Sequence, residues 1–117
     1  MTVQYIAICF IGAGSVYGQS DTEDRAVKIA LQEALSFAKA FGGFKKGVEP
    51  LPFNVYDYRP WDRISWDGNR VFGHLNNGAP GNSVELTALR HVFIDPTTKN
   101  TTRSVTHDQW LAERKSA

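Results

Sequence analysis

The stretch from residue 20 to residue 43 constrains the fold more than any other, because it carries the complete pattern of one amphipathic helix. Ser20 and Glu23 have the spacing of a capping box, and the acidic residues after Ser20 suit the positive end of a helix. Gly42 and Gly43 supply a stop signal. The apolar positions recur at helical spacing: Val27, Ala30, Leu31, Ala34, Leu35, Ala38 and Phe41. Such a stripe predicts a helix that packs on a sheet.

The segments on either side of this helix have the patterns of strands. Residues 3–11 are β-prone and mostly apolar on both faces, which is typical of a central strand. Pro50 and Pro52 argue against a central strand before residue 53, whereas residues 53–58 alternate as a strand does. Asp67-Gly68 suits a tight two-residue turn, and two strand patterns, over residues 86–94 and 103–106, predict a second hairpin.

A short helix is expected at the end of the chain, over residues 107–115, because Thr106 and Gln109 form a second capping box. The element order is therefore strand, long helix, a run of strands and a short helix. This order predicts a single α+β domain over residues 1–117: a mostly antiparallel sheet of about five strands, with the long helix packed on one face and a short C-terminal helix.

Length, charge and cysteine content bound the class of protein. The chain has 117 residues, the size of one domain, and a net charge of +1, which excludes a strong field for nucleic acid or an acidic membrane. Cys9 is the only cysteine, so no intrachain disulfide forms and a reducing compartment is favoured. No Lys or Arg precedes Arg25, unlike a secretory signal, and the first apolar run is too short to span a bilayer. We expect a soluble, cytoplasmic protein without membrane contact.

Motifs for cofactors, metals and nucleophiles are weak. The segment GAGSVYG lies between a strand and a helix, where an anion-binding loop must be considered. Its G-x-G-x-x-x-G spacing departs from the dinucleotide fingerprint, and the acids that follow would repel phosphate. A glycine bulge or tight turn is favoured, and no cofactor is expected. The three histidines, His74, His91 and His107, have no close metal-ligand spacing, so no metal is expected. No nucleophile motif is present, and no catalytic residue is assigned.

The first predicted hairpin divides into two faces. With Asp67-Gly68 at the turn, Trp66 lies opposite Asn69 and Ile64 lies opposite Val71. One face then carries the apolar side chains and is assigned to the core: Ile64, Trp66 and Val71. The other face is expected to be exposed or covered by a partner, because it carries charge: Trp61, Arg63, Arg70 and Phe72.

A mixture of arginines and aromatic residues between residues 56 and 78 favours a binding function. Trp, Tyr and Arg are the residues most enriched at interface hot spots. We therefore expect a small non-catalytic binding or regulatory protein that acts through protein–protein contacts. Threonine-rich edge strands near residues 97–106 also favour self-association as a homodimer. The candidate binding residues are Tyr56, Tyr58, Arg59, Trp61, Arg63, Arg70, Phe72 and His74.

Two alternative functions remain open. Tyr56, Tyr58, Trp61 and Phe72 suit base stacking, so the same face is a candidate for single-stranded nucleic acid. The low net charge and the acids interleaved with the arginines argue against it. The other alternative is a small-molecule binder or enzyme, with a site formed by His74, Asn76, Asn77 and Arg90. In that case Asp57 would orient His74 as a general base.

Overall fold

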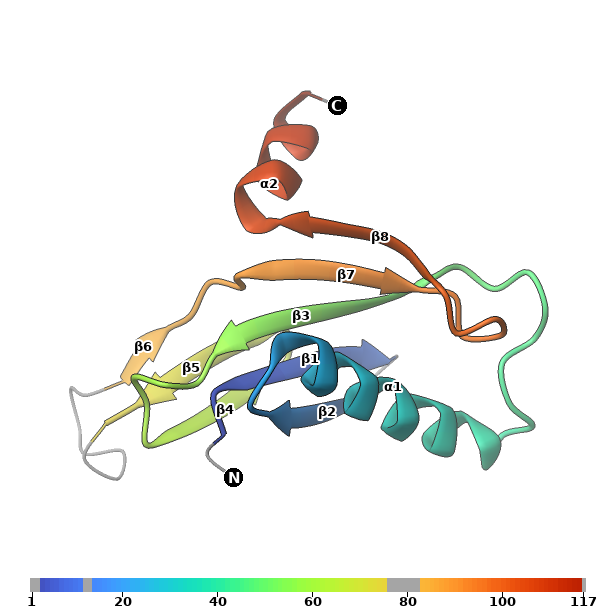
Figure 1. Ribbon diagram of the computed structural model, residues 1–117, viewed down its shortest axis with the longest axis horizontal. Helices are drawn as coiled ribbons and strands as arrows, with labels where there is room; N and C mark the ends of the chain where they lie inside the picture. The colour runs from blue at the N-terminus through green and yellow to red at the C-terminus, as the bar shows by residue number, and fades with distance from the viewer. Residues whose placement is uncertain (1–2, 12–13, 76–82, 117) are drawn as a thin grey trace.

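The computed structural model describes residues 3–11, 14–75 and 83–116 and shows an α+β fold built around a five-stranded antiparallel sheet (Figure 1). The strand order is β2-β1-β3-β7-β8, so the first two strands pair at one side and the last two at the other. The strands are β1 (Tyr5–Ile11), β2 (Gly14–Ser20), β3 (Leu51–Asp57), β7 (Arg90–Ile94) and β8 (Thr101–Thr106). This confirms the predicted fold class.

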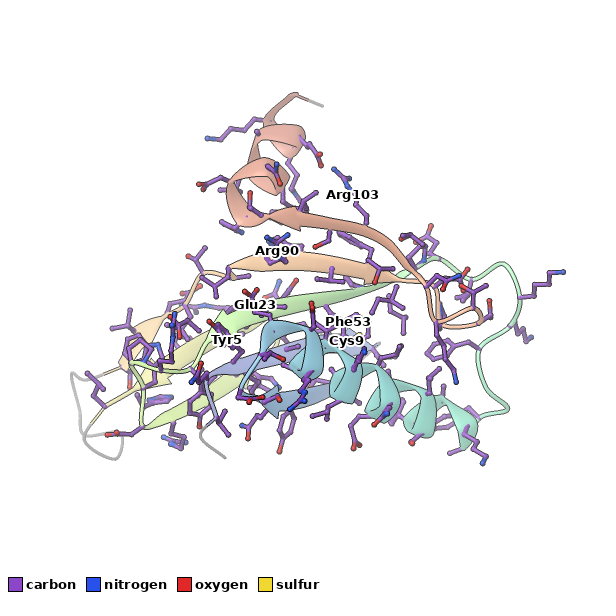
Figure 2. All side chains as sticks on the ribbon, in the orientation of Figure 1. Tyr5, Cys9, Glu23, Phe53, Arg90 and Arg103 are labelled. Carbon is purple, nitrogen blue, oxygen red and sulfur yellow. The ribbon has the colours of Figure 1, made fainter. Side chains whose placement is uncertain are left out.

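The long helix α1 (Glu23–Lys39) packs on one face of this sheet, as predicted. It buries four of the predicted stripe positions, Val27, Ala30, Leu31 and Ala34, and also Ala26. These side chains meet a core that includes Cys9 and Phe53, both labelled in Figure 2. The predicted stop is confirmed, since Gly42 and Gly43 have φ angles of 93° and 80° directly after the helix.

Both ends of the predicted helix need correction. The N-cap is Thr22, whose hydroxyl accepts a hydrogen bond from the Arg25 N–H at 3.2 Å. Ser20 does not cap the helix, because it is the buried last residue of β2 and its hydroxyl donates to Asp21. Phe41 lies beyond the helix and is 78% exposed, so the apolar stripe ends earlier than its sequence spacing indicates.

The segment GAGSVYG forms part of a β-hairpin, in which β2 pairs with β1 from Ile11↔Gly14 to Tyr5↔Ser20. Residues 12 and 13 lie outside the described residues. Gly18 sits directly under α1, where a β-carbon would fall 2.5 Å from the backbone nitrogen of Ala30. This glycine therefore permits close packing of a strand against a helix.

A second, three-stranded sheet packs on the face opposite α1. It has the order β4-β5-β6, with β4 (Arg63–Asp67), β5 (Arg70–His74) and β6 (Ser83–Glu85). Side chains of β1 alternate between two cores: Ala7 and Cys9 face α1, whereas Ile6 and Ile8 face the small sheet. This explains why residues 3–11 are apolar on both faces. The second core contains Ile6, Ile8, Tyr56, Ile64, Val71 and Ala88.

The register of the β4–β5 hairpin differs from the prediction by two residues. Asp67 pairs with Arg70 and Trp66 with Val71, so Gly68 and Asn69 form the turn, and Gly68 has a φ of 61°. A shift of two residues leaves each side chain on its predicted face. Ile64 and Val71 are buried, and Trp66 packs against the same core.

The C-terminal third of the chain follows the prediction except at the starts of two strands: β8 begins at Thr101, two residues before the predicted start, and β7 begins later than predicted. Strand β7 begins at Arg90, not residue 86, because residues 86–89 cross between the two sheets. Along this crossing Leu86 donates to the Val71 carbonyl and Leu89 to the Val55 carbonyl. Helix α2 (His107–Ser116) begins at the predicted capping box: Thr106 N–H donates to Gln109, and the Gln109 N–H donates to the Thr106 hydroxyl.

Candidate functional site

The solvent side of the three-stranded sheet brings together part of the predicted binding set. Alternation along β4, β5 and β6 places every second side chain on this side, and the pairs Arg63↔His74, Ser65↔Phe72 and Phe72↔Glu85 align them across the strands. We call this surface the outer face. Its residues are Arg63, Ser65, Asp67, Arg70, Phe72, His74, Ser83 and Glu85.

Arg70 and Phe72 form the centre of the outer face. The Arg70 guanidinium donates to Oε1 of Glu85 at 2.8 Å and lies 5.3 Å from the centre of the Phe72 ring. The Glu85 carboxylate raises the pKa of Arg70 through this hydrogen bond, so the guanidinium stays charged. A cation held over an aromatic ring and tied to a carboxylate keeps a defined geometry on an otherwise exposed surface.

His74 lies beside this centre, between two serine hydroxyls. Ser65 Oγ is 2.6 Å from Nε2 of the ring, and Ser83 Oγ is 2.6 Å from Nδ1. In a neutral imidazole one nitrogen donates and the other accepts. With a neutral ring, one serine hydroxyl therefore accepts a hydrogen bond from the ring N–H, while the other donates a hydrogen bond to the second ring nitrogen.

Asp57 does not orient His74, although the enzyme alternative required this contact for His74 to act as a general base. Its carboxylate accepts two hydrogen bonds from the Arg59 guanidinium at 2.9 Å, and this interaction lowers the pKa of Asp57. Arg59 also lies 5.3 Å from the centre of the Tyr5 ring. This predicted binding residue is thus exposed and tied to Asp57 and Tyr5, which belong to β3 and β1, rather than to the outer face.

Three of the predicted binding residues pack in or against the second core, between the two sheets, and not on the outer face. Tyr56 is only 5% exposed and is part of the second core, and burial raises the pKa of its hydroxyl. Tyr58 and Trp61 are partly buried against the same core. Trp61 was expected to point away from the core, and this is wrong: a β-carbon on Gly73 would fall 2.5 Å from its Cε2. The indole fills the space that this glycine leaves.

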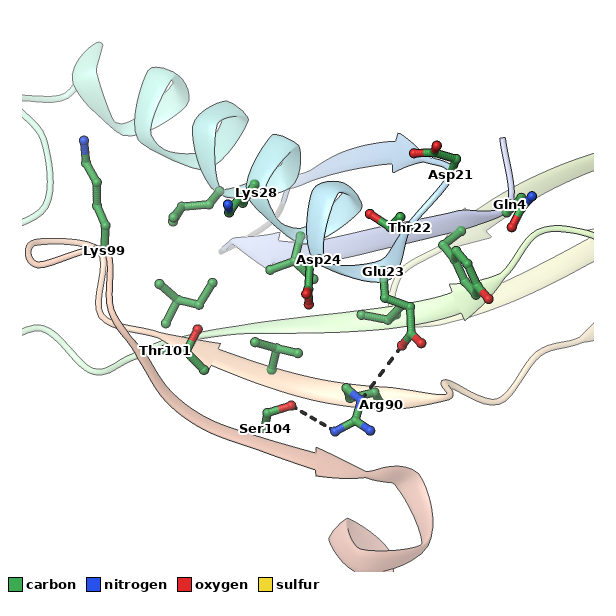
Figure 3. Close-up of a pocket in the computed structure, with 16 residues that line it drawn as sticks. Gln4, Asp21, Thr22, Glu23, Asp24, Lys28, Arg90, Lys99, Thr101 and Ser104 are labelled. Atoms are coloured by element: carbon green, nitrogen blue, oxygen red, sulfur yellow. Dashed lines mark hydrogen bonds and ion pairs between the residues drawn. The ribbon is translucent and has the colours of Figure 1, made fainter. Parts of the chain in front are cut away.

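Arg90 lies apart from His74, on the α1 side of the large sheet. It lines a groove of about 860 Å³ between the start of α1 and strands β7 and β8. Figure 3 shows its side chain between those of Glu23 and Ser104. Its guanidinium lies 3.9 Å from Glu23 and donates to Ser104 at 3.0 Å. The structure therefore does not bring Arg90 and His74 into one pocket, and Asn76 and Asn77 lie outside the described residues.

Sequence reasoning missed a pair of histidines that joins α2 to the sheet. Nδ1 of His91 donates to Asn54 Oδ1 at 2.9 Å, and Nε2 of His91 lies 2.9 Å from Nδ1 of His107. Trp110 stacks on His91 with ring centres 4.5 Å apart. Burial, and then the neighbouring His107, lower the pKa of His91. The second predicted hairpin was a signal for this pair, because its antiparallel strands bring His91 beside Val105, two residues before His107.

Comparison with known proteins gives no match, neither to a family model nor to a curated protein nor to a solved structure. Within the described ranges, no helix is long and apolar enough to cross a membrane. No cluster of three or more His, Cys, Asp or Glu side chains that could hold a metal ion occurs among the same residues.

Proposed function

We propose that this chain is a non-catalytic binding protein that contacts a partner protein through the outer face. The observation that carries the proposal is the arrangement of Arg70, fixed between Glu85 and the Phe72 ring on the solvent side of the small sheet. Both charged side chains of this pair are more than half exposed, at 64% and 53%. Preorganised arginine and aromatic side chains are typical of interface hot spots, because ordering them on binding costs little.

The side chains around this centre indicate the chemistry of the partner. Phe72 is partly exposed and offers an apolar contact. Arg63 is exposed, and among the residues that the structure describes it has no ion-pair partner. A partner segment with an apolar side chain over Phe72 and a carboxylate within reach of Arg63 would complement both. We propose a cytoplasmic partner, because a single cysteine favours a reducing compartment.

Single-stranded nucleic acid is less well supported as the ligand. Base stacking needs several exposed aromatic rings along one surface. Of the four predicted platforms, Phe72 lies on the outer face, whereas Tyr56, Tyr58 and Trp61 pack against the second core.

A hydrolytic site at His74 is a second candidate, favoured by the two serine hydroxyls at 2.6 Å from its ring nitrogens. In this arrangement one serine would be the nucleophile, His74 the base and the other serine its orienting group. A fluorophosphonate probe tests this candidate. Labelling of wild type that Ser65→Ala or Ser83→Ala abolishes would support it, and absence of labelling would exclude a serine nucleophile of this kind.

The binding proposal is tested by photo-crosslinking in cell lysate from a benzoylphenylalanine placed at position 72. The matched control carries the same group at Gln32, an exposed position on α1. We expect a discrete crosslinked protein from position 72 that is not obtained from position 32 and that survives nuclease treatment. Identical products from both positions, or no product from position 72, would contradict the proposal. Loss of the product on nuclease treatment would favour nucleic acid.

A further inference from the structure

Strand β2 is an edge strand of the large sheet with little protection against pairing. Figure 1 shows β2 at the side of the sheet farthest from β8. Its seven residues, GSVYGQS, contain no charged residue and no proline, and its register with β1 is regular throughout. Proteins protect sheet edges with lysines, prolines, bulges or a covering element. An unprotected edge of this length is typical of a site of strand pairing.

The opposite edge, β8, has the protection that β2 lacks. Its pairing with β7 contains an irregularity between Phe93 and Ile94. Arg103 in the middle of β8 forms an ion pair with Glu113, which ties helix α2 to this strand. We therefore expect self-association at β2 and not at the threonine-rich strand β8.

The backbone groups of β2 that face outward can be identified from the register. The Tyr58 N–H donates to the Gln4 carbonyl, which continues the β1–β3 register of Ile6 with Tyr56. Even-numbered residues of β1 therefore hydrogen-bond to β3 and odd-numbered residues to β2, except that the N–H of Gln4, just before β1, donates to Ser20 of β2. The partners of those odd residues in β2 are even-numbered. The N–H and C=O groups of Ser15, Tyr17 and Gln19 therefore point to the free edge.

A groove of about 460 Å³ runs along this edge, lined by residues 15–19 of β2 and by Ile29 and Glu33 of α1. Apolar side chains stand on both sides of it. Ile29 is 37% exposed on the helix side, and Tyr17 is 48% exposed on the other side, where its ring meets Trp66 edge-on at 5.2 Å. The edge thus combines unpaired backbone groups with exposed apolar surface.

We propose that β2 pairs with β2 of a second copy of this chain, antiparallel about a two-fold axis through Tyr17. The strand extends three residues to each side of Tyr17, so this axis pairs all seven residues: Tyr17 with the partner's Tyr17, and Ser15 with the partner's Gln19. The outward N–H and C=O groups of both strands are then satisfied. The two five-stranded sheets become one continuous sheet.

Helix α1 fits the same two-fold pairing through charge. Arg25, Ile29 and Glu33 follow at intervals of four and share one face of the helix. Ile29 lies next to Gly18 and hence close to the axis. Because the two α1 helices run antiparallel, Arg25 of one protomer lies opposite the partner's Glu33. This self-complementary pattern favours a second copy over an unrelated extended peptide.

The test is the mass of the protein in solution, measured by sedimentation over a wide concentration range. We expect a dimer for wild type and a monomer for Tyr17→Pro, which removes an outward N–H without removing a bond to β1. The control Thr101→Pro, at the first residue of the opposite edge strand, should remain dimeric. A monomer at the highest concentration of wild type, or a dimer that Tyr17→Pro leaves intact, would overturn the proposal.

A charge exchange on exposed helix positions gives a second test that does not depend on the fold of a proline variant. Arg25→Glu alone places like charges across the axis and should raise the dimer dissociation constant by about tenfold or more. Arg25→Glu combined with Glu33→Arg should restore the wild-type constant to within about threefold. Failure of the double variant to restore dimerisation would contradict the antiparallel pairing of the helices.

Discussion

Trp61 covers Gly73, and the two residues fit so closely that any side chain on Gly73 would overlap the indole ring. Gly73 is the partner of Ile64 in the β4–β5 pairing, on the face that turns toward the large sheet. The contact places the Trp61 indole against the second core, where it is partly buried.

Gly73→Ala should lower the free energy of unfolding by about 1–3 kcal/mol, because the new methyl group displaces the Trp61 ring. The same substitution in a Trp61→Ala background should cost much less, since the ring is no longer there. Urea unfolding of the two single variants and the double variant measures this coupling. If the losses in unfolding free energy of the two single variants add up in the double variant, the new methyl group and the indole ring do not compete for the same space.

Gly18→Ala should destabilise the protein by about 1–3 kcal/mol, because the methyl group meets backbone atoms of α1 that cannot rotate away. Gly14 in the same strand is the matched control. There the nearest atom to a new methyl group is the Ile11 carbonyl oxygen at 3.8 Å, an ordinary contact distance. Thermal unfolding should therefore separate Gly18→Ala from a nearly neutral Gly14→Ala, and equal effects would argue against close packing of β2 on α1.

His91 should make stability depend on pH. Its pKa is lowered in the folded state, so the unfolded chain binds more protons once the pH falls below about 6.5. Asn54 and Val105 flank it from the neighbouring strands, while His107 and Trp110, with Arg114 beyond, face it from α2. The free energy of unfolding should therefore decrease from pH 7.5 to about pH 5.5, and more steeply for wild type than for His91→Gln. Identical slopes would contradict this assignment.

Cys9 should be unreactive in the folded protein. It is fully buried under α1, and burial raises the pKa of its thiol to about 12, so almost no thiolate exists at neutral pH. Ellman's reagent should react slowly with the native chain and rapidly in denaturant. Rapid reaction of the native protein would show that the first core opens readily.

The local elements of this fold could be predicted because each has its own sequence signal. The α1 stripe, the Gly42-Gly43 stop and the Thr106–Gln109 capping box depend only on neighbouring residues. The division into two sheets could not be predicted in this way. Alternation along residues 63–74 identifies an apolar face, but it does not reveal whether that face meets a helix or a second sheet.

Only part of the candidate site could be predicted from the sequence. Arg63, Arg70, Phe72 and His74 share a face because they lie on two paired strands, and the alternation along those strands already implied it. Tyr56, Tyr58 and Trp61 were placed with them by proximity in sequence, although long-range packing directs these rings to the second core. The β7–β8 hairpin brings His91 and His107 together, and the separation of the two residues in sequence does not by itself reveal this contact.

Binding of the crosslinked partner by purified variants tests the role of the outer face most directly. Phe72→Ala and Arg63→Ala should each weaken binding, measured by titration calorimetry, by about tenfold or more. Arg59→Ala, an exposed arginine tied to Asp57 away from this face, should bind as wild type does. If all three variants bind equally well, or if Arg59→Ala alone loses binding, the outer face is not the recognition surface of this protein.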